Sequence, residues 1–146
     1  SRLPVPRNLR ALAENTVYKK ECGACHYAFN PSLLPASSWA GLMANLGEHF
    51  GEDASLGSAA TSSLAAWLVA NAAETFDTES ANRFRVVAPD APYRITLTPY
   101  WVNKHAGLAR DVFARKSVRS KANCNACHRD AESGRYDDQA IAIPEK

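Results

Sequence analysis

Two copies of one five-residue motif constrain this chain more than any other feature of its sequence. Residues 22–26 read CGACH and residues 124–128 read CNACH, and both match the C-x-x-C-H pattern that marks covalent attachment of a c-type haem. In this pattern the two thiols add to the haem vinyl groups, and the histidine that follows binds the iron. The motifs use all four cysteines of the chain: Cys22, Cys25, Cys124 and Cys127. The sequence therefore predicts two covalently bound haems.

Other uses of paired cysteines explain this sequence less well. A thioredoxin-like redox site needs a single C-x-x-C pair and gives no reason for a histidine after each pair. A zinc ribbon places its two pairs about 15–20 residues apart, whereas about a hundred residues separate them here. In a framework of disulfides, a bond within either pair would close too short a loop to stabilise the fold.

The number of histidines matches what two six-coordinate haem irons require. The chain has four, of which His26 and His128 belong to the motifs, while His49 and His105 do not. The two histidines outside the motifs would complete bis-histidine coordination at both irons. Met43 is the only methionine, so at most one iron has histidine–methionine coordination instead. A methionine within an apolar stripe usually fills a hydrophobic core, and the histidine count does not require it as a ligand.

Two pairings of the four histidines are open. In the local pairing, His49 serves the haem of His26 and His105 serves the haem of His128, and the members of each pair are 23 positions apart. In the crossed pairing, 79 residues separate the members. Loop-closure entropy favours the shorter loops by roughly 1 kcal/mol per haem, a margin that packing can override. We therefore expect the local pairing.

Both histidines outside the motifs lie at helical spacing from apolar residues. A helix predicted over residues 39–50 carries an apolar stripe on one face, with His49 at its end. Thr98 followed by Pro99 is typical of a helix start, and this helix has His105 on the same face as Trp101. A lone histidine on such a face is most often a hydrogen-bonded core residue. With two irons to coordinate, we interpret both as ligands.

The remaining sequence predicts a mainly α protein with two small haem-centred lobes. We expect a class I cytochrome c-like lobe over residues 1–78 and an irregular helical lobe over residues 79–146. The predicted helices outside the histidine-bearing ones lie at about 8–20 and 64–75 and just before Gly134, the tail from 136 is irregular, and residues 94–98 alternate like a short strand.

Composition and charge exclude some classes of function. The formal net charge of +2 is small, and the haem propionates cancel most of it, so a nucleic-acid partner is not expected. A basic helix predicted over residues 104–121 is either a solvated face or a surface for propionates or an acidic partner. No stretch approaches the roughly 20 apolar residues of a membrane span. The chain begins at Ser1, which suggests a mature exported protein, and c-type haems are attached outside the bacterial cytoplasm.

Two resemblances extend this interpretation. Residues 1–78 resemble a class I cytochrome c domain, with a helix that enters the first motif, a proline-bearing loop and a closing helix around Trp67. The segment departs from that class in its sixth ligand, which is usually a methionine from a later loop. The whole chain resembles the dihaem cytochrome c family of purple bacteria. The segments that carry this resemblance are 39–54, 64–68, 100–105 and 124–128.

The family resemblance implies a soluble periplasmic electron carrier with two bis-histidine, low-spin haems. It also implies an oxygen-binding monohaem cytochrome c as electron acceptor and a membrane cytochrome b as donor. With both axial positions filled, the irons have no open site for substrate, so we expect a carrier and not an enzyme. The alternative is a small haem enzyme, or a gas-binding or redox sensor, which would need one labile axial ligand, His49 or His105.

Overall fold

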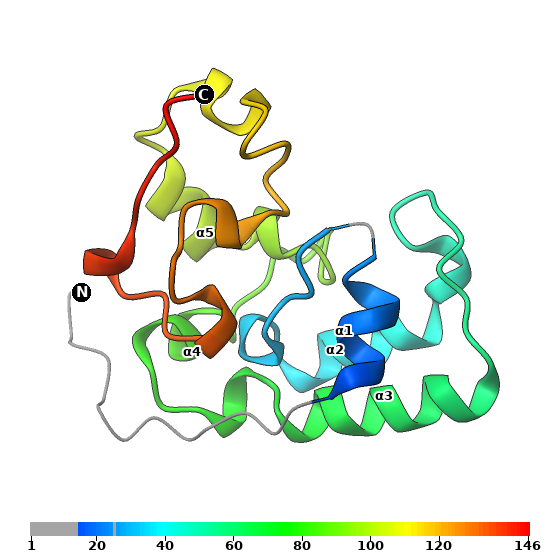
Figure 1. The fold of residues 1–146 in the computed structure, drawn as a ribbon. Coiled ribbons are helices and arrows are strands. Elements are labelled where there is room, and N and C mark those ends of the chain that lie inside the picture. The colour runs from blue at the N-terminus through cyan, green and yellow to red at the C-terminus, as the bar shows by residue number, and fades with distance from the viewer. Residues whose placement is uncertain (1–14, 25) are drawn as a thin grey trace.

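The fold is mainly helical, as the sequence predicts, and has no strands within the residues that the structure describes (Figure 1). This computed structural model describes residues 15–24 and 26–146. The α-helices are α1 (Thr16–Cys22), α2 (Ala36–Ala44), α3 (Ser58–Ala70), α4 (Glu79–Arg83) and α5 (Pro99–His105). Short 3-10 helices lie at Pro31–Leu33, Leu46–Glu48, Ala73–Thr75, Ile95–Leu97, Arg110–Ala114, Cys124–Ala126, Ala131–Ser133 and Asp138–Ala140.

Helices α1, α2 and α3 build the core of the first half. Helix α3 is the longest, with 13 residues, and it packs against α2. Leu64 and Leu68 lie one turn apart on its buried face, each 1% exposed. The ring of Trp67 packs against Tyr18 of α1 at 5.0 Å between centroids, and the indole of Trp39 in α2 donates a hydrogen bond of 2.7 Å to the carbonyl of Pro31, in the first 3-10 helix. The Tyr18–Trp67 contact holds α1, the helix that leads into the first motif, against α3.

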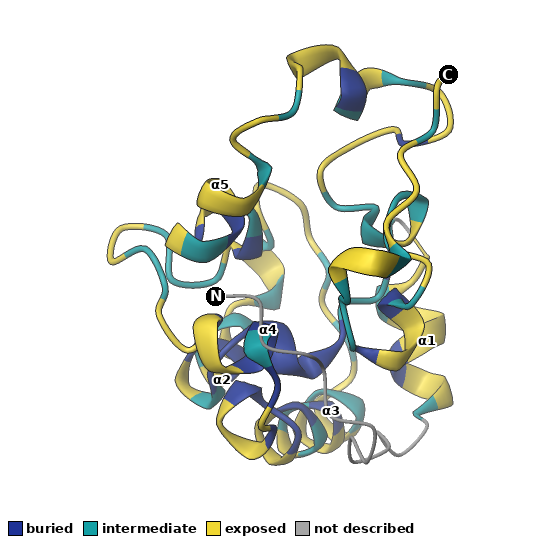
Figure 2. Ribbon diagram, turned by 90° about the vertical axis from the view of Figure 1, so that its left-hand side faces the viewer, coloured by how far each residue is buried: buried dark blue, intermediate teal, exposed yellow. Residues whose placement is uncertain are grey.

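The core continues into the second half of the chain. Phe84, Ile95 and Trp101 belong to the same hydrophobic cluster as the residues of α2 and α3. Helix α4 packs against the 3-10 helices at residues 31–33 and 73–75. Figure 2 shows most of the buried residues around α2, α3 and α4, whereas the loops farther from these helices are mostly exposed. The division into lobes 1–78 and 79–146 therefore stays a proposal, with one cluster spanning it.

Two predicted helices are shorter than their patterns suggested. Helix α2 ends at Ala44, because the side chain of Asn45 donates a hydrogen bond to the carbonyl of Gly41 and its backbone leaves the helical region. A 3-10 turn follows, so His49 lies in a turn and not on a helix. The basic segment 104–121 is not one helix either: α5 ends at His105, and only a 3-10 helix follows it.

The other local predictions had mixed outcomes. The strand predicted over 94–98 is wrong: the Thr98 hydroxyl donates to the Ile95 carbonyl and closes a 3-10 turn there. The helix predicted over 64–75 instead runs as α3 from Ser58. A 3-10 helix does end at Gly134, which takes a left-handed conformation, and α1 forms at 16–22, although the start of its predicted range lies outside the described residues. No described helix is long and apolar enough to cross a bilayer.

Candidate haem centres

The second motif and His105 meet at one cavity. Cys124, Cys127, His105 and His128 all line it, together with aromatic and aliphatic side chains. The rings of the two histidines are 6.2 Å apart between centroids and inclined by 68°. Because metal–imidazole bonds are about 2 Å long, an iron bound between two imidazoles separates the ring centroids by roughly 6 Å. The residues at this centre therefore fit a haem iron between the two rings.

Helix α5 orients His105. Thr98 caps the helix by accepting a hydrogen bond from the Trp101 amide, and Pro99 occupies its first turn, both as the sequence predicts. Nδ1 of His105 lies 2.7 Å from the Trp101 carbonyl, and the two rings stack at 4.1 Å. When Nδ1 donates this bond, Nε2 is free to bind a metal. Burial lowers the pKa of His105, which favours the neutral, metal-binding form.

The tail of the chain supports the second motif. The His128 amide donates to the Cys124 carbonyl at 2.9 Å, which closes the motif into a turn. The Ala142 amide donates to the Cys127 carbonyl at 2.8 Å, and the Arg129 amide donates to Ala140 at 3.1 Å. Burial lowers the pKa of His128. The sequence predicts an irregular tail and gives no signal of this supporting role.

The described cysteines form no disulfide, and in the polypeptide without haem burial keeps their thiols protonated. Burial raises the pKa of Cys22 to about 11 and that of Cys124 to about 12, and it also raises the pKa of Cys127. A redox-active C-x-x-C pair has the opposite property, because its attacking thiol has a lowered pKa. These thiols therefore do not fit a thioredoxin-like role. Cys25, the other predicted attachment point, lies outside the described residues.

The first motif follows directly on α1. Gly23 caps the helix by donating its amide hydrogen to the Lys19 carbonyl, at a place where a side chain would collide with that carbonyl. Nδ1 of His26 lies 2.7 Å from the Tyr27 carbonyl, so Nε2 of this histidine is also available to a metal. The ring of His26 packs against Phe29 at 5.1 Å.

His49 lies near His26, but it is held by a turn and not by a helix. Its amide donates to the Glu52 carbonyl at 2.8 Å, and the Glu52 amide donates back to the His49 carbonyl at 3.0 Å. Burial lowers the pKa of His49, and the nearby His26 and Arg94 lower it further. The rings of His105 and His128 therefore form a close pair, whereas His49 lies near enough to His26 to affect its electrostatics, without a ring contact between the two in the described residues.

A hydrogen-bonded tyrosine pair joins the two motif segments. Tyr27 donates to the Ala131 carbonyl at 2.7 Å, and its hydroxyl lies 3.0 Å from that of Tyr136. Burial raises the pKa of both tyrosines, so both hydroxyls keep their protons. The ring of Tyr136 in turn packs edge-on against His128 at 5.3 Å. Sequence reasoning missed this contact, since no local pattern connects residues so far apart.

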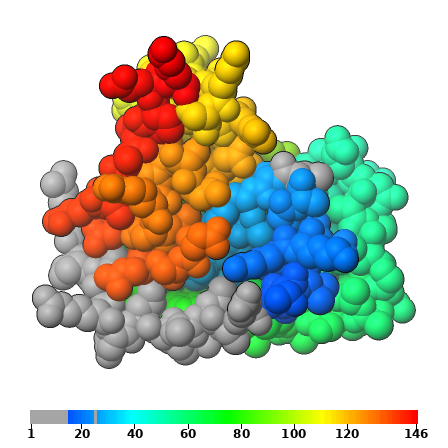
Figure 3. All heavy atoms as spheres, viewed as in Figure 1, coloured from blue at the N-terminus to red at the C-terminus, as the bar shows by residue number. Residues whose placement is uncertain are grey.

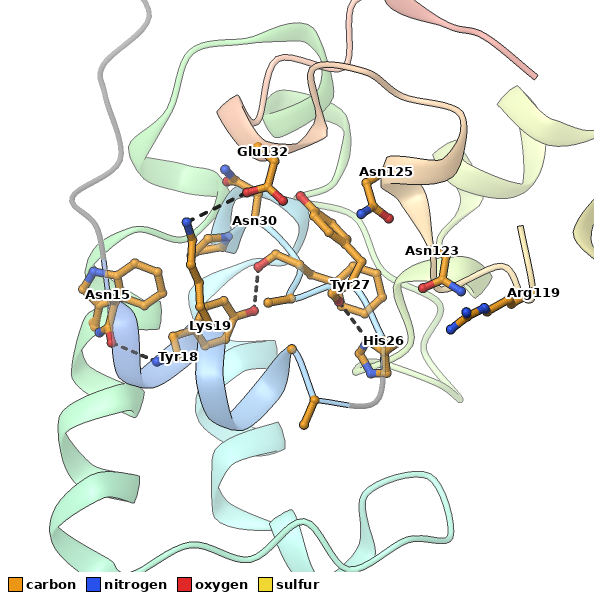
Figure 4. A pocket seen from close by; sticks show the side chains of 16 residues that line it. Asn15, Tyr18, Lys19, His26, Tyr27, Asn30, Arg119, Asn123, Asn125 and Glu132 are labelled. Atoms are coloured by element: carbon orange, nitrogen blue, oxygen red, sulfur yellow. Dashed lines mark hydrogen bonds and ion pairs between the residues drawn. The ribbon is translucent and has the colours of Figure 1, made fainter. Parts of the chain in front are cut away.

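The same interface is hollowed beside the first motif. A cavity of about 650 Å³ lies between α1, the first-motif segment and residues near the second motif. Figure 4 shows Tyr27 and His26 near its middle, with Asn123 and Asn125 from the second half facing them. In the space-filling view, the second-motif segment (orange) lies directly against the first-motif segment (blue) (Figure 3). The two candidate centres are therefore neighbours across a packed interface.

A mainly helical fold with two haem-attachment motifs, and with the paired rings of His105 and His128 at the second of them, defines a small c-type cytochrome with two centres. The family model of dihaem cytochrome c matches residues 18–136, and the chain belongs to this family. The protein is therefore a haem-based electron-transfer cytochrome with two covalently bound c-type haems.

Three solved structures are similar to this chain over nearly their whole length. A diheme cytochrome c from Rhodobacter sphaeroides is 41% identical, with a TM-score of 0.69, covering 86% of this chain and 98% of that one. DHC purified from the same organism is 39% identical, with a TM-score of 0.65, covering 84% and 97%. The diheme cytochrome c of Shewanella baltica OS155 is 32% identical, with a TM-score of 0.70, covering 90% and 94%. A comparison with curated proteins gave no match.

Proposed function

We propose that this protein is a periplasmic electron carrier whose two haems are low-spin and coordinated by two histidines each. Cys22 and Cys25 attach the first haem, and Cys124 and Cys127 attach the second. The irons are bound by two local pairs of histidines: His26 with His49, and His105 with His128. The observation that carries the proposal is the 6.2 Å separation between the rings of His105 and His128, which suits an iron between them.

Several features of the chain support electron transfer in place of substrate chemistry. The haem supplies a one-electron change of oxidation state when it is bound. His105 is oriented by its bond to the Trp101 carbonyl, and Trp101 covers one face of its ring. Phe113 lies 6.4 Å from the same ring, between centroids, and helps to exclude water. Filled axial positions, with His105 fixed by these contacts, keep the structural change at the second haem small on oxidation.

The position of Met43 supports histidine as the sixth ligand of the first haem. Met43 is 4% exposed and belongs to the hydrophobic cluster formed by α2, α3 and the residues around them. A thioether in such a cluster acts as core filler. Two imidazoles lower the reduction potential relative to an imidazole and a thioether. We therefore infer low potentials at both centres.

The proposed partners are an oxygen-binding monohaem cytochrome c as acceptor and a membrane cytochrome b as donor. Both come from the family resemblance. Some of the basic side chains that could meet an acidic partner already have partners within the chain: Lys104 pairs with Asp138 at 3.2 Å, and Arg115 pairs with Asp111 at 3.1 Å. The remaining exposed basic residues near the second motif include Arg119 and Lys121. We propose the electron donor or acceptor docks beside them.

The optical spectrum of the purified holoprotein tests the carrier function. We expect low-spin bands from both haems in the oxidised and reduced states, an intact mass two haems above that of the polypeptide, and reversible reduction of both centres in a redox titration. A high-spin haem in the resting protein would contradict the proposal and favour an enzyme or a sensor. A mass gain of one haem would contradict the dihaem assignment.

A further inference from the structure

The imidazole rings of the four proposed ligands are kept in place by different contacts, and that of His49 has the fewest. His26 and His128 follow motif cysteines, so covalent attachment of the haem tethers them beside the iron. His105 has no such tether, but its Nδ1 is bonded to the Trp101 carbonyl at 2.7 Å. The imidazole of His49 has neither a tether nor, in the described part of the chain, a hydrogen-bonding partner. Metal-bound histidines almost always donate their second ring nitrogen to such a partner.

The turn that carries His49 is also strained. Residues 49 and 52 are bonded in both directions, so Phe50 and Gly51 form a two-residue turn. Both have positive φ angles, 52° and 87°. Glycine takes this conformation readily, but a bulky side chain such as phenylalanine rarely does. Turns of this kind prefer asparagine or aspartate before the glycine. The ligand-bearing turn is therefore held in a conformation that its own sequence disfavours.

Arg94, from the second half of the chain, covers this turn. Its guanidinium lies 4.4 Å from the centroid of the Phe50 ring, and the Phe50 ring lies 4.7 Å from that of His49. Phe50 is 45% exposed, so little else in the described structure encloses it. The cation over the ring opposes movement of Phe50 away from the protein. Because His49 is the adjacent residue, the same contact limits movement of its imidazole.

We propose that the first haem has an exchangeable coordination site: His49 leaves the ferrous iron and a small neutral ligand such as carbon monoxide binds there, while His105 stays bound. Arg94 is a positioning residue that sets how readily His49 leaves. In the exchange one iron–nitrogen bond breaks and one iron–carbon bond forms, with no transfer of electrons or protons. The inference rests on the proposed assignment of His49 as a ligand.

Mixing the ferrous holoprotein with carbon monoxide, followed by stopped-flow absorption, tests this inference. We expect half of the total haem to form the carbon monoxide adduct. The rate should level off as carbon monoxide increases, because release of His49 becomes limiting. Arg94→Ala should raise that limiting rate about two- to fivefold, the effect expected from loss of one exposed cation–π contact. Arg94→Lys, which keeps a cation over the ring, should restore most of the original rate.

Lys121 offers a matched control at the other centre. Its ammonium lies 5.6 Å from the centroid of the Trp101 ring, beside His105, much as Arg94 lies over the neighbour of His49. Lys121→Ala should not make the second haem reactive, because the Nδ1 bond of His105 is unaffected. A second carbon monoxide adduct in this variant would contradict the idea that the Nδ1 bond decides which histidine exchanges.

His49→Ala separates failure of this inference from failure of the ligand assignment. In the unmodified protein, release of His49 makes carbon monoxide binding a slow phase. In this variant that slow phase should be replaced by a fast phase of the same amplitude. A slow phase that persists would show that the second haem exchanges, which overturns the inference. Absence of any adduct in both the unmodified protein and Arg94→Ala overturns it too, and leaves bis-histidine coordination intact. If His49→Ala keeps both haems low-spin, the ligand assignment itself is wrong.

Discussion

The first and second halves of the chain each present two motif cysteines and two histidines, on different backbone structures. In the first half, the motif follows an α-helix and His49 lies in a tight turn. In the second half the order is reversed: His105 ends an α-helix, and the motif is a 3-10 turn supported by the tail. The same residue types are therefore delivered to the two candidate centres by different local structures.

The halves also differ in how many hydrophobic side chains the polypeptide buries without help from a haem. The first half has α2 packed on α3 and most of the hydrophobic cluster. Beyond His105, the buried hydrophobic side chains of the described residues are only Val112, Val118 and Ala131. So few buried groups cannot offset the conformational entropy of about 40 ordered residues. We therefore expect the segment beyond His105 to depend on its haem for structure more than the first half does.

Removal of each attachment motif tests this difference and should have the largest effect. In the variant Cys124→Ala with Cys127→Ala, we expect loss of one haem and rapid hydrogen exchange throughout residues 106–146. The matched variant, Cys22→Ala with Cys25→Ala, should also lose one haem but keep slow exchange in α3. Intact mass and hydrogen-exchange mass spectrometry measure both. If both halves were equally protected from hydrogen exchange in their respective variants, the proposed difference in their dependence on the haem would be wrong.

Exchange of one axial ligand sharpens the comparison at the level of the iron. His105→Met should raise the reduction potential of one haem by an appreciable part of the roughly 0.8 V range that axial ligands span, because a thioether favours the ferrous state. The potential of the other haem should stay nearly unchanged. A spectroelectrochemical titration measures both potentials. If neither potential moves, His105 is not a ligand.

Shortening one buried side chain tests whether the first half holds the shared core. Leu68→Ala should lower the free energy of unfolding by about 2–5 kcal/mol, because a leucine that is 1% exposed leaves a cavity when truncated. Val69→Ala, on the exposed side of the same helix, should change it by less than about 0.5 kcal/mol. Denaturant unfolding followed by circular dichroism gives both values. A similar loss in the two variants would contradict the assigned core.

Loss of the hydroxyl contact between Tyr27 and Tyr136, which links the two halves, should have the smallest effect on the free energy of unfolding. Tyr136→Phe removes the hydroxyl that meets Tyr27, but Tyr27 keeps its bond to the Ala131 carbonyl. We expect a loss of about 1 kcal/mol in the free energy of unfolding, the usual net value of one hydrogen bond. Tyr93→Phe serves as control, since no hydrogen bond of its hydroxyl is present within residues 15–24 and 26–146. Denaturant unfolding of the two variants should separate them, and equal stabilities would mean that the tyrosine pair contributes nothing.

Features set by local chemistry could be predicted from the sequence. The C-x-x-C-H motifs predict two haems, which the family match confirms. The Thr98–Pro99 start of α5 is confirmed, because capping depends only on residues within one turn. The identity of the ligand histidines rests on their number and spacing, and it stays a prediction.

Features set by competition or by distant contacts could not be predicted. The apolar spacing of residues 39–50 continues past the point where Asn45 ends the helix, so periodicity alone misplaced His49 on a helix. The alternation at residues 94–98 suggested a strand, but the described chain offers no neighbouring strand, and the Thr98 hydroxyl closes a turn there instead. The contact between the Arg94 guanidinium and the Phe50 ring joins the two halves of the chain, and no local sequence pattern predicts it.

The Tyr27–Tyr136 hydroxyl pair also bears on the order in which this protein folds. Its two residues are separated by 109 positions. A contact of such long range costs loop-closure entropy before its favourable interactions form, so contacts of this kind form late in folding. We therefore expect the contact between the two hydroxyls to form late in folding.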